Sequence, residues 1–198
     1  MKFPDNFVFG GATAAYQCEG STLKYGKGKV AWDDYLKKEG RFSGDPASDF
    51  YHQYPIDLKL CRDYGIKGIR ISIAWSRIFP NGDETTPNEE GLKFYEDLID
   101  ECLKYNIEPL ITISHYEVPF DTPDALHKIG DFLNHEIIDQ YTNYAKFCFQ
   151  EYHDEVKYWF TFNEVWPIAV NQYIVGSFPP AIKYDIPKAV YSMHHMMV

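Results

Sequence analysis

Residues 68–77 read GIRISIAWSR. Isoleucine takes every second position at the start of this stretch, at Ile69, Ile71 and Ile73. Arg70 and Ser72 alternate with these isoleucines, which predicts a strand with one apolar face and one polar face. Ser76 and Arg77 follow the strand, so polar side chains gather where it ends.

The same succession of a strand-like segment and an amphipathic helix repeats along the chain. Three further strands are predicted, at residues 7–15, 107–114 and 156–162. Helices are predicted from apolar spacings of three and four at residues 49–64 and 88–105 (with Asn88 as cap), after a cap at Asn134, and from about Pro187 onward. Strands that alternate with helices, and that read as buried on both faces, indicate four βα units on a parallel sheet.

Both doubly wound sheets and barrels contain such units. Residues 10–14 read GGATA, so the first strand lacks the G-x-G-x-x-G signature of dinucleotide-binding sheets. Polar residues instead follow all four strands: Gln17 and Glu19, Ser76 and Arg77, His115 and Glu117, and Asn163 and Glu164. This distribution is typical of the catalytic face of a (β/α)8 TIM barrel. We therefore expect the N-terminal half of such a barrel, as a single partial catalytic domain over residues 1–198 that ends within the helix of the fourth unit.

The charge balance argues against several classes of partner. The chain has 29 acidic and 19 basic residues and a net charge of −10, whereas nucleic-acid surfaces need clustered Lys and Arg. A small phosphorylated ligand is still compatible, because it needs only a local cationic pocket. No long apolar run or basic amphipathic stretch supports a membrane role.

The N-terminus and the cysteines predict a cytoplasmic protein. Residues 1–6 read MKFPDN and run into a strand-like segment without an apolar signal core. The four cysteines are widely spaced and form no C-x-x-C pair: Cys18, Cys61, Cys102 and Cys148. His194 and His195 point about 100° apart on a predicted helix, so they do not predict a metal site.

The strongest chemical signal is TFNE at residues 161–164. On an extended strand, Phe160 and Phe162 share the pleat face of Glu164, which would remove water from this carboxyl group, as a general acid requires. Aromatic residues make up 17% of the chain, enough for a few to line a sugar site besides the core. On its own, however, an Asn-Glu pair is more often a solvated strand end.

Five segments in the same order as in family 1 glycoside hydrolases favour the catalytic interpretation, because together they resemble that family. FVFGGATAAYQCEG at residues 7–20 is similar to the family's opening strand and sugar-binding loop. Tyr64-Gly65 and GIRISIAWSRIFP at residues 68–80 resemble its second strand, and Ser114-His115 stands at its sugar-contacting histidine. TFNE resembles its acid/base motif, and the likeness spans essentially all 198 residues.

The resemblance implies a role for each matching position. Glu164 would be the acid/base, and Asn163 would contact the sugar 2-hydroxyl. Gln17 and His115 would bind hydroxyls of the sugar that is transferred. Arg70 would support the nucleophilic carboxylate. No metal or organic cofactor is implied. Taken alone, His115 would more often be structural and Gln17 a solvated loop residue.

Within the family, several stretches resemble 6-phospho-β-galactosidases. These are residues 45–52, 121–127 with 130–134, and 178–185. The middle of the chain, residues 81–119, looks more like 6-phospho-β-glucosidases, and residues 115–123 read as two versions of one loop in tandem. The implied substrate is a phosphorylated β-glycoside, with the choice between galacto and gluco left open.

One catalytic group of the family has no counterpart here. A retaining glycosidase uses two carboxyl groups about 5–5.5 Å apart, and no I-T-E-N-G-like nucleophile motif occurs in the sequence. We interpret Glu19 as loop structure and Glu117 as a rim residue. The isolated chain is therefore expected to be inactive, with a non-catalytic half-barrel that binds sugar or a partner as the alternative. We also expect an unpaired Arg70 and self-association through the exposed first and fourth strands.

Overall fold

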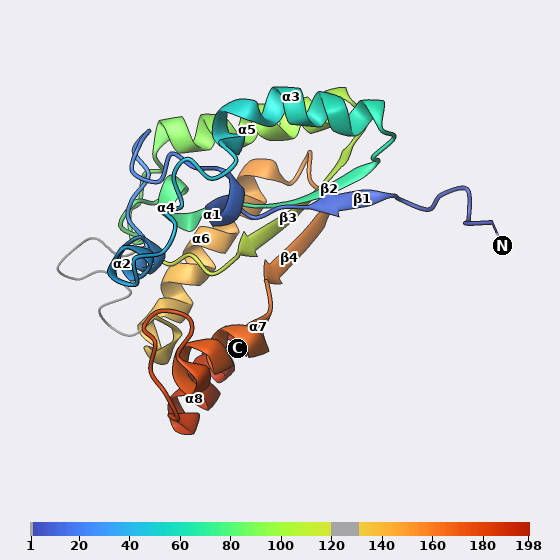
Figure 1. Ribbon diagram of the computed structural model, residues 1–198. Coiled ribbons are helices and arrows are strands. Elements are labelled where there is room, and N and C mark those ends of the chain that lie inside the picture. Colours follow the sequence, from blue (N-terminus) through green and yellow to red (C-terminus); the bar gives the residue numbers. More distant parts are fainter. Residues whose placement is uncertain (1, 120–130) are drawn as a thin grey trace.

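A computed structural model describes residues 2–119 and 131–198. Its sheet has four parallel strands in chain order: β1 (Gly10–Ala12), β2 (Gly68–Ser72), β3 (Glu108–Ser114) and β4 (Tyr158–Phe162). Figure 1 shows the strands fanning out side by side. The predicted parallel sheet of four βα units is confirmed. The residues 121–127 and Gly130, quoted above for their likeness, lie outside the described residues, as does the end of the tandem loop.

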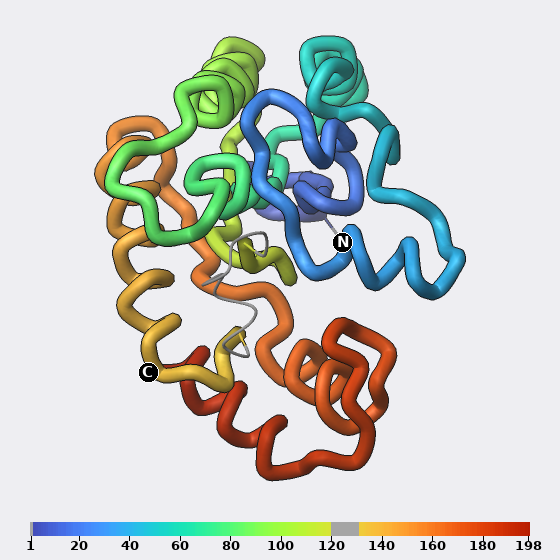
Figure 2. Tube along the Cα trace, turned by 90° about the vertical axis from the view of Figure 1, so that its left-hand side faces the viewer, coloured from blue at the N-terminus to red at the C-terminus, as the bar shows by residue number. Residues whose placement is uncertain are grey.

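Three long helices pack against the apolar side of the sheet: α3 (Phe50–Asp63), α5 (Glu89–Lys104) and α6 (Glu136–Tyr152). The helices α3 and α5 lie alongside each other, with α6 next along the sheet (Figures 1 and 2). The fourth unit continues into α7 (Val165–Val170), a π-helical turn η3 (Asn171–Val175) and α8 (Ile186–Met197). All the long helices therefore occur where the apolar periodicity predicts them.

The core lies between the sheet and these helices, as the alternation in β2 predicts. Ile69, Ile71 and Ile73 are buried there with the corresponding isoleucines of β3, Ile111 and Ile113. The opposite face of the sheet carries Arg70, Thr112 and Phe160, whose side chains contact one another. This polar face would line the interior of a closed barrel.

Short helices follow the strands, and the sequence did not predict them. They are α1 (Ala15–Cys18), α2 (Ala31–Lys38), α4 (Trp75–Ile78) and the 3-10 turn η2 (Asp131–Leu133). The first predicted strand is too long for this reason, because Ala15 already begins α1 and donates its N–H to Ser72 Oγ at 2.8 Å. Elements of three or four residues, such as α1, α4 and η2, are too short to show an apolar period, and tertiary contacts fix them instead.

The two predicted caps act differently from the prediction. Asn88 precedes α5 but makes no side-chain cap; its amide donates to the carbonyls of Tyr25 and Arg77 at 2.8 and 3.0 Å. Asn134 lies one residue before the observed N-cap of α6, and its Oδ1 accepts from the N–H of Glu136 at 3.1 Å. Asn88 therefore occupies the predicted N-cap position but bonds to other segments, whereas Asn134 bonds to the start of α6 from one residue before the cap.

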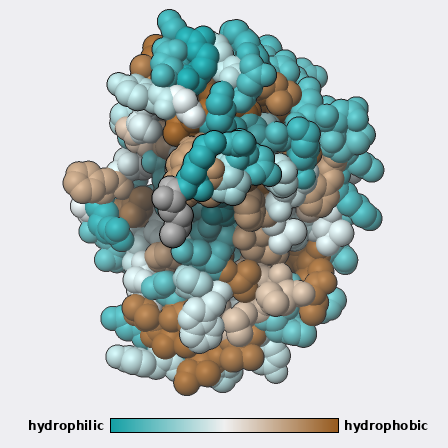
Figure 3. Space-filling view, turned by 90° about the vertical axis from the view of Figure 1, so that its right-hand side faces the viewer, coloured by the Kyte–Doolittle hydropathy of each residue, from teal (hydrophilic) through white to brown (hydrophobic). Residues whose placement is uncertain are grey.

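The surface includes apolar regions that a closed barrel would cover. The outer strands of the sheet are β1 and β4, and Tyr158 of β4 is 56% exposed. Figure 3 shows apolar side chains gathered over α7 and α8 in its lower part, where Ile186, Val190 and Met197 are exposed. Within residues 2–119 and 131–198, no helix combines the length and apolar character needed to cross a membrane.

We expect the isolated chain to self-associate through the edge of β4. Unpaired strand edges offer backbone donors and acceptors to a second chain, so light scattering after size exclusion should give a mass above 23.1 kDa. The Tyr158→Lys variant should shift the chain toward the monomer, because a charge on an edge strand opposes pairing. Tyr184→Lys is the matched control, since Tyr184 is exposed outside the sheet. A compact monomer that melts at a concentration-independent temperature would contradict this expectation.

Candidate active site

The carboxyl ends of the four parallel strands bring the predicted site residues to one edge of the sheet. Three of them, together with Tyr116, form a continuous chain of contacts in the order Arg70, Asn163, Tyr116 and Glu164. Gln17 and His115 line a cavity that also borders Tyr116. The structure therefore places all five predicted residues around this one tyrosine, which the sequence analysis did not select.

Arg70 projects from the polar face of β2 and is fully engaged with neutral partners. Its Nε donates to Thr112 Oγ1 at 2.8 Å and its Nη2 to Asn163 Oδ1 at 2.9 Å. The guanidinium also lies 4.7 Å from the ring centroid of Phe160, within range of a cation–π interaction. As expected, no acidic side chain among the described residues pairs with Arg70; a hydroxyl, an amide and a ring hold its guanidinium instead.

The Asn163 side chain is held in one orientation. Its oxygen accepts from Arg70, while its Nδ2 donates to the Tyr116 hydroxyl at 2.9 Å, and the residue is only 9% exposed. The Tyr116 hydroxyl in turn donates to Glu164 Oε2. Burial, and then the bond to Glu164, raise the pKa of Tyr116 well above its ordinary value, so this hydroxyl keeps its proton at neutral pH.

Glu164 lies past the end of β4 in the left-handed backbone region, with φ of 51°. The expectation that Phe160 and Phe162 both flank it is wrong. Phe160 contacts Arg70 on the polar face, whereas Phe162 stacks on Tyr141 of α6 at 4.5 Å. Strand alternation does not extend to Glu164 because the backbone leaves the extended region, and this carboxyl group is exposed.

A cavity of about 390 Å³ opens beside this chain of contacts. Aromatic and polar side chains share its lining, among them Tyr16, Gln17, Trp32, His115, Tyr116 and Phe178. Burial, and then the charge of Arg70, lower the pKa of His115 to about 4, so its imidazole is neutral at neutral pH. A neutral imidazole both donates and accepts a hydrogen bond, and flat rings pack on the apolar faces of a sugar.

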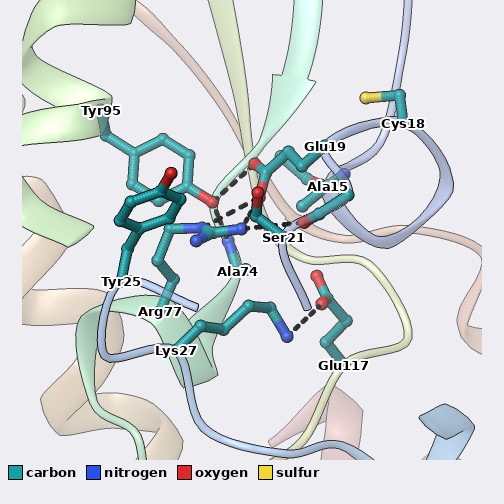
Figure 4. A network of polar contacts seen from close by, with 12 residues as sticks. Ala15, Cys18, Glu19, Ser21, Tyr25, Lys27, Ala74, Arg77, Tyr95 and Glu117 are labelled. Atoms are coloured by element: carbon teal, nitrogen blue, oxygen red, sulfur yellow. Dashed lines mark hydrogen bonds and ion pairs between the residues drawn. The ribbon is translucent and has the colours of Figure 1, made fainter. Parts of the chain in front are cut away.

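Behind the cavity lies a buried ionic network, drawn in Figure 4. Glu19 accepts from Arg77 Nη2 at 2.9 Å and from the Tyr95 hydroxyl at 2.8 Å, which agrees with its interpretation as loop structure. Lys27 and Glu117 form a second pair at 3.5 Å. The prediction that Glu117 is a rim residue is wrong, since it is 3% exposed. Arg77, expected at the catalytic face, is completely buried.

Among residues 2–119 and 131–198, no three side chains of the metal-binding types lie together. His194 is exposed, and the partly buried His195 uses Nδ1 to contact the carbonyl of Phe132 at 2.8 Å. The paired histidines therefore belong to the surface and the packing of α8.

Four parallel βα units, with polar side chains gathered beyond the strand ends, are the architecture of about half of an α/β barrel. The chain belongs to glycosyl hydrolase family 1, whose family model matches residues 1–198. It is 60% identical over 197 residues to a 6-phospho-β-galactosidase of Clostridium acetobutylicum, covering 100% of this chain and 40% of that protein. A 6-phospho-β-galactosidase of Staphylococcus epidermidis is 56% identical, with 41% of it covered. The chain thus spans about 40% of the length of these curated relatives.

Solved structures confirm the half-barrel. A β-glucosidase from Thermotoga maritima superimposes with a TM-score of 0.93 at 36% identity, covering 99% of this chain and 44% of that one. An aphid myrosinase gives a TM-score of 0.91 at 32% identity, covering 100% of this chain and 43% of that one. Four parallel βα units therefore correspond to about half of an α/β barrel.

We expect Glu117 to make the stability of the fold depend on pH. Burial raises its pKa from 4.5 to about 7, while Lys27 opposes the shift. Because its pKa is raised in the folded state, Glu117 favours folding most when it is protonated. The free energy of unfolding is therefore highest below about pH 4.5 and falls as the pH rises through 7, by at most about 3 kcal/mol. Glu117→Gln should therefore melt close to the parent at about pH 5 and higher than the parent at about pH 8. Thermal melts across this range test it, with exposed Glu151→Gln as control. Parallel curves for parent and Glu117→Gln would contradict it.

Proposed function

We propose that the chain is the N-terminal part of a retaining β-glycosidase that hydrolyses 6-phospho-β-galactosides. The observation that carries this proposal is the chain of contacts from Arg70 to Glu164, at the strand ends of a family 1 half-barrel. It joins a carboxyl group, an oriented amide and a cation beside a sugar-sized cavity.

In this proposal Glu164 is the acid/base. It first protonates the leaving oxygen, and a glutamate outside this chain forms the glycosyl-enzyme; Glu164 then removes a proton from the attacking water. Its exposed carboxyl, beyond the end of β4, is accessible to both the leaving group and water. The Tyr116 hydroxyl fixes one carboxylate oxygen and leaves the other available.

The remaining residues would bind the sugar and support the nucleophile. Asn163 presents an amide already oriented by Arg70 and Tyr116 for contact with the 2-hydroxyl. Gln17 and the neutral His115 line the cavity; His115 Nδ1 is buried and has no partner among the described residues. A sugar hydroxyl would satisfy it. Arg70 would hold the nucleophilic carboxylate from the same face of the sheet.

Two further features favour a phosphorylated galactoside in the cytoplasm. The two relatives named above, at 60% and 56% identity, are 6-phospho-β-galactosidases, which favours the galacto substrate over the gluco one. All four cysteines are free, and Cys102 and Cys148 are buried, as in proteins of reducing compartments. A phosphorylated sugar would be the substrate, and neither a nucleic acid nor a membrane is part of the proposal.

The isolated 198-residue chain should show no glycosidase turnover. Two-step retention needs a nucleophile besides the acid/base, and loss of that carboxylate removes the covalent route. The measurement is release of the chromophore from aryl 6-phospho-β-galactoside and 6-phospho-β-glucoside, with folding checked by circular dichroism. Turnover that disappears in the Glu164→Gln variant would show that this chain contains its own nucleophile.

In a protein extended to the relatives' full length, Glu164→Gln should affect substrates according to their leaving group. General acid catalysis contributes about 10²–10⁴-fold, and an activated aryl leaving group needs little of it. The variant's kcat/KM should therefore fall far more with an alkyl or sugar leaving group than with a nitrophenyl one. Glu151→Gln, on the exposed side of α6, is the matched control. Equal losses on both substrates would show that Glu164 is not the acid.

A further inference from the structure

Lys27 and Glu117 form an ion pair that water barely reaches. Their Nζ and Oε1 are 3.5 Å apart, and each side chain is 2% exposed (Figure 4). Neither oxygen of Glu117 accepts a hydrogen bond among the described residues. Lys27 Nζ donates a long hydrogen bond to the carbonyl of Gly28, at 3.4 Å, and lies 5.9 Å from the ring centroid of Tyr16. The pair is thus buried but incompletely satisfied.

Such a pair is a poor source of stability. Removing two charges from water costs more than a long, weakly hydrogen-bonded contact returns. Glu117 also faces Glu19 and Asp33, whose charges oppose its ionisation, as well as Lys27 and Arg77, which favour it. Its raised pKa agrees with a net penalty for the ionised carboxylate. A role other than stabilisation therefore has to account for the pair.

The position of the pair suggests that role. Glu117 lies in a turn, residues 115–119, that follows β3, and Lys27 lies in a segment, residues 27–32, that leads into α2. Two further contacts join the same turn and segment. Trp32 Nε1 donates to the carbonyl of Tyr116 at 3.1 Å, and Val30 forms an antiparallel bridge with Pro119. The ion pair is the only charged contact of these three.

The turn carries two residues of the sugar site. His115 and Tyr116 line the cavity, and the Tyr116 hydroxyl bonds to both Asn163 and Glu164. Tyr116 has φ of 75°, a backbone region that is unfavourable for a non-glycine residue and persists only when its surroundings hold it. A turn that relaxed would carry the tyrosine away from both partners.

We propose that Lys27 and Glu117 are positioning residues: their buried pair locks the turn of residues 115–119 against residues 27–32 and thereby holds Tyr116 between Asn163 and Glu164. The importance of this for catalysis rests on the proposed function. The positioning itself is a property of the described chain and is measured without substrate. The pair acts on the site through Tyr116 and touches no substrate.

The test follows the indole N–H signal of Trp32 by nuclear magnetic resonance. The chain has four tryptophans, so four indole signals are expected, and Trp32→Phe identifies the relevant one. Deuteration of the sample keeps the indole signals narrow enough to observe even if the chain self-associates. Lys27→Met leaves the carboxyl group unpaired, while Lys27→Met/Glu117→Leu removes both charges and replaces them with apolar volume, a change that folds tolerate. The matched control is Lys93→Met/Asp97→Asn, which breaks an exposed pair on α5.

In both Lys27 variants the Trp32 signal should shift or broaden, while those of Trp75, Trp159 and Trp166 stay in place. Hydrogen exchange at the Trp32 indole should become about tenfold faster as the turn opens. The control should leave all four signals unchanged. If Lys27→Met fails to fold, the Trp32 signal of the charge-free double variant still tests the proposal. A double variant with a parental Trp32 signal and parental exchange would overturn the proposal and make the pair a packing feature only. This test uses no glycosidase assay. A failure of the proposed function would appear only in the turnover measurements and would leave the result for the Lys27–Glu117 pair unchanged.

Discussion

Arg77 has no solvent exposure, yet its guanidinium remains paired inside the molecule. It donates twice to Glu19, at 2.9 and 3.0 Å, and lies over the rings of Tyr51 and Phe94. These contacts join the loop after β1 to α3, α4 and α5. An unpaired charge at this depth would be very costly. The segment at Glu19 therefore has little freedom, and the helix α1 directly before it carries Gln17 to the cavity.

A close backbone contact supports the same arrangement. Gly91, in the first turns of α5, leaves no room for a side chain, since a Cβ there would lie 2.1 Å from the carbonyl of Arg77. The helix can therefore pack directly on α4, and Tyr95, one turn further along, donates to Glu19 while accepting from the N–H of Ala74. The helix layer thus fixes both the core and the base of the site loops.

The parts that the sequence predicts are those governed by local periodicity. The isoleucines of β2 and the apolar stripe of α5 repeat at the spacing of their own element, and both are buried as predicted. Likewise, Asn163 and Glu164 follow directly from a strand end. The residues that were misjudged depend on partners distant in sequence. Glu117 is buried because Lys27, ninety positions earlier, meets it. Likewise, the neutral partners that hold Arg70 are distant in sequence: Thr112 lies on β3 and Asn163 just beyond β4.

Tyr116 shows how such a residue could have been found. It follows His115 directly at the end of β3, the same position that Glu164 takes relative to Asn163 after β4. Residues that follow neighbouring parallel strands meet at one edge, so a hydroxyl there has the two polar residues of the next strand within reach. The left-handed backbone at Tyr116 could not be predicted, because the residue there is neither glycine nor asparagine, the types that usually adopt it.

The exposure of Glu164 indicates what each half of a complete barrel of this family would contribute to the active site. A general acid must hold its proton near neutral pH, and loss of solvent is the usual physical means. In this half, Phe160 lies against Arg70, Phe162 stacks on Tyr141 of α6, and Glu164 is exposed. On the proposed function, the second half of the barrel would have to close over this face. It would then supply two things at once: the nucleophile itself and a cover that removes water from the face carrying Glu164.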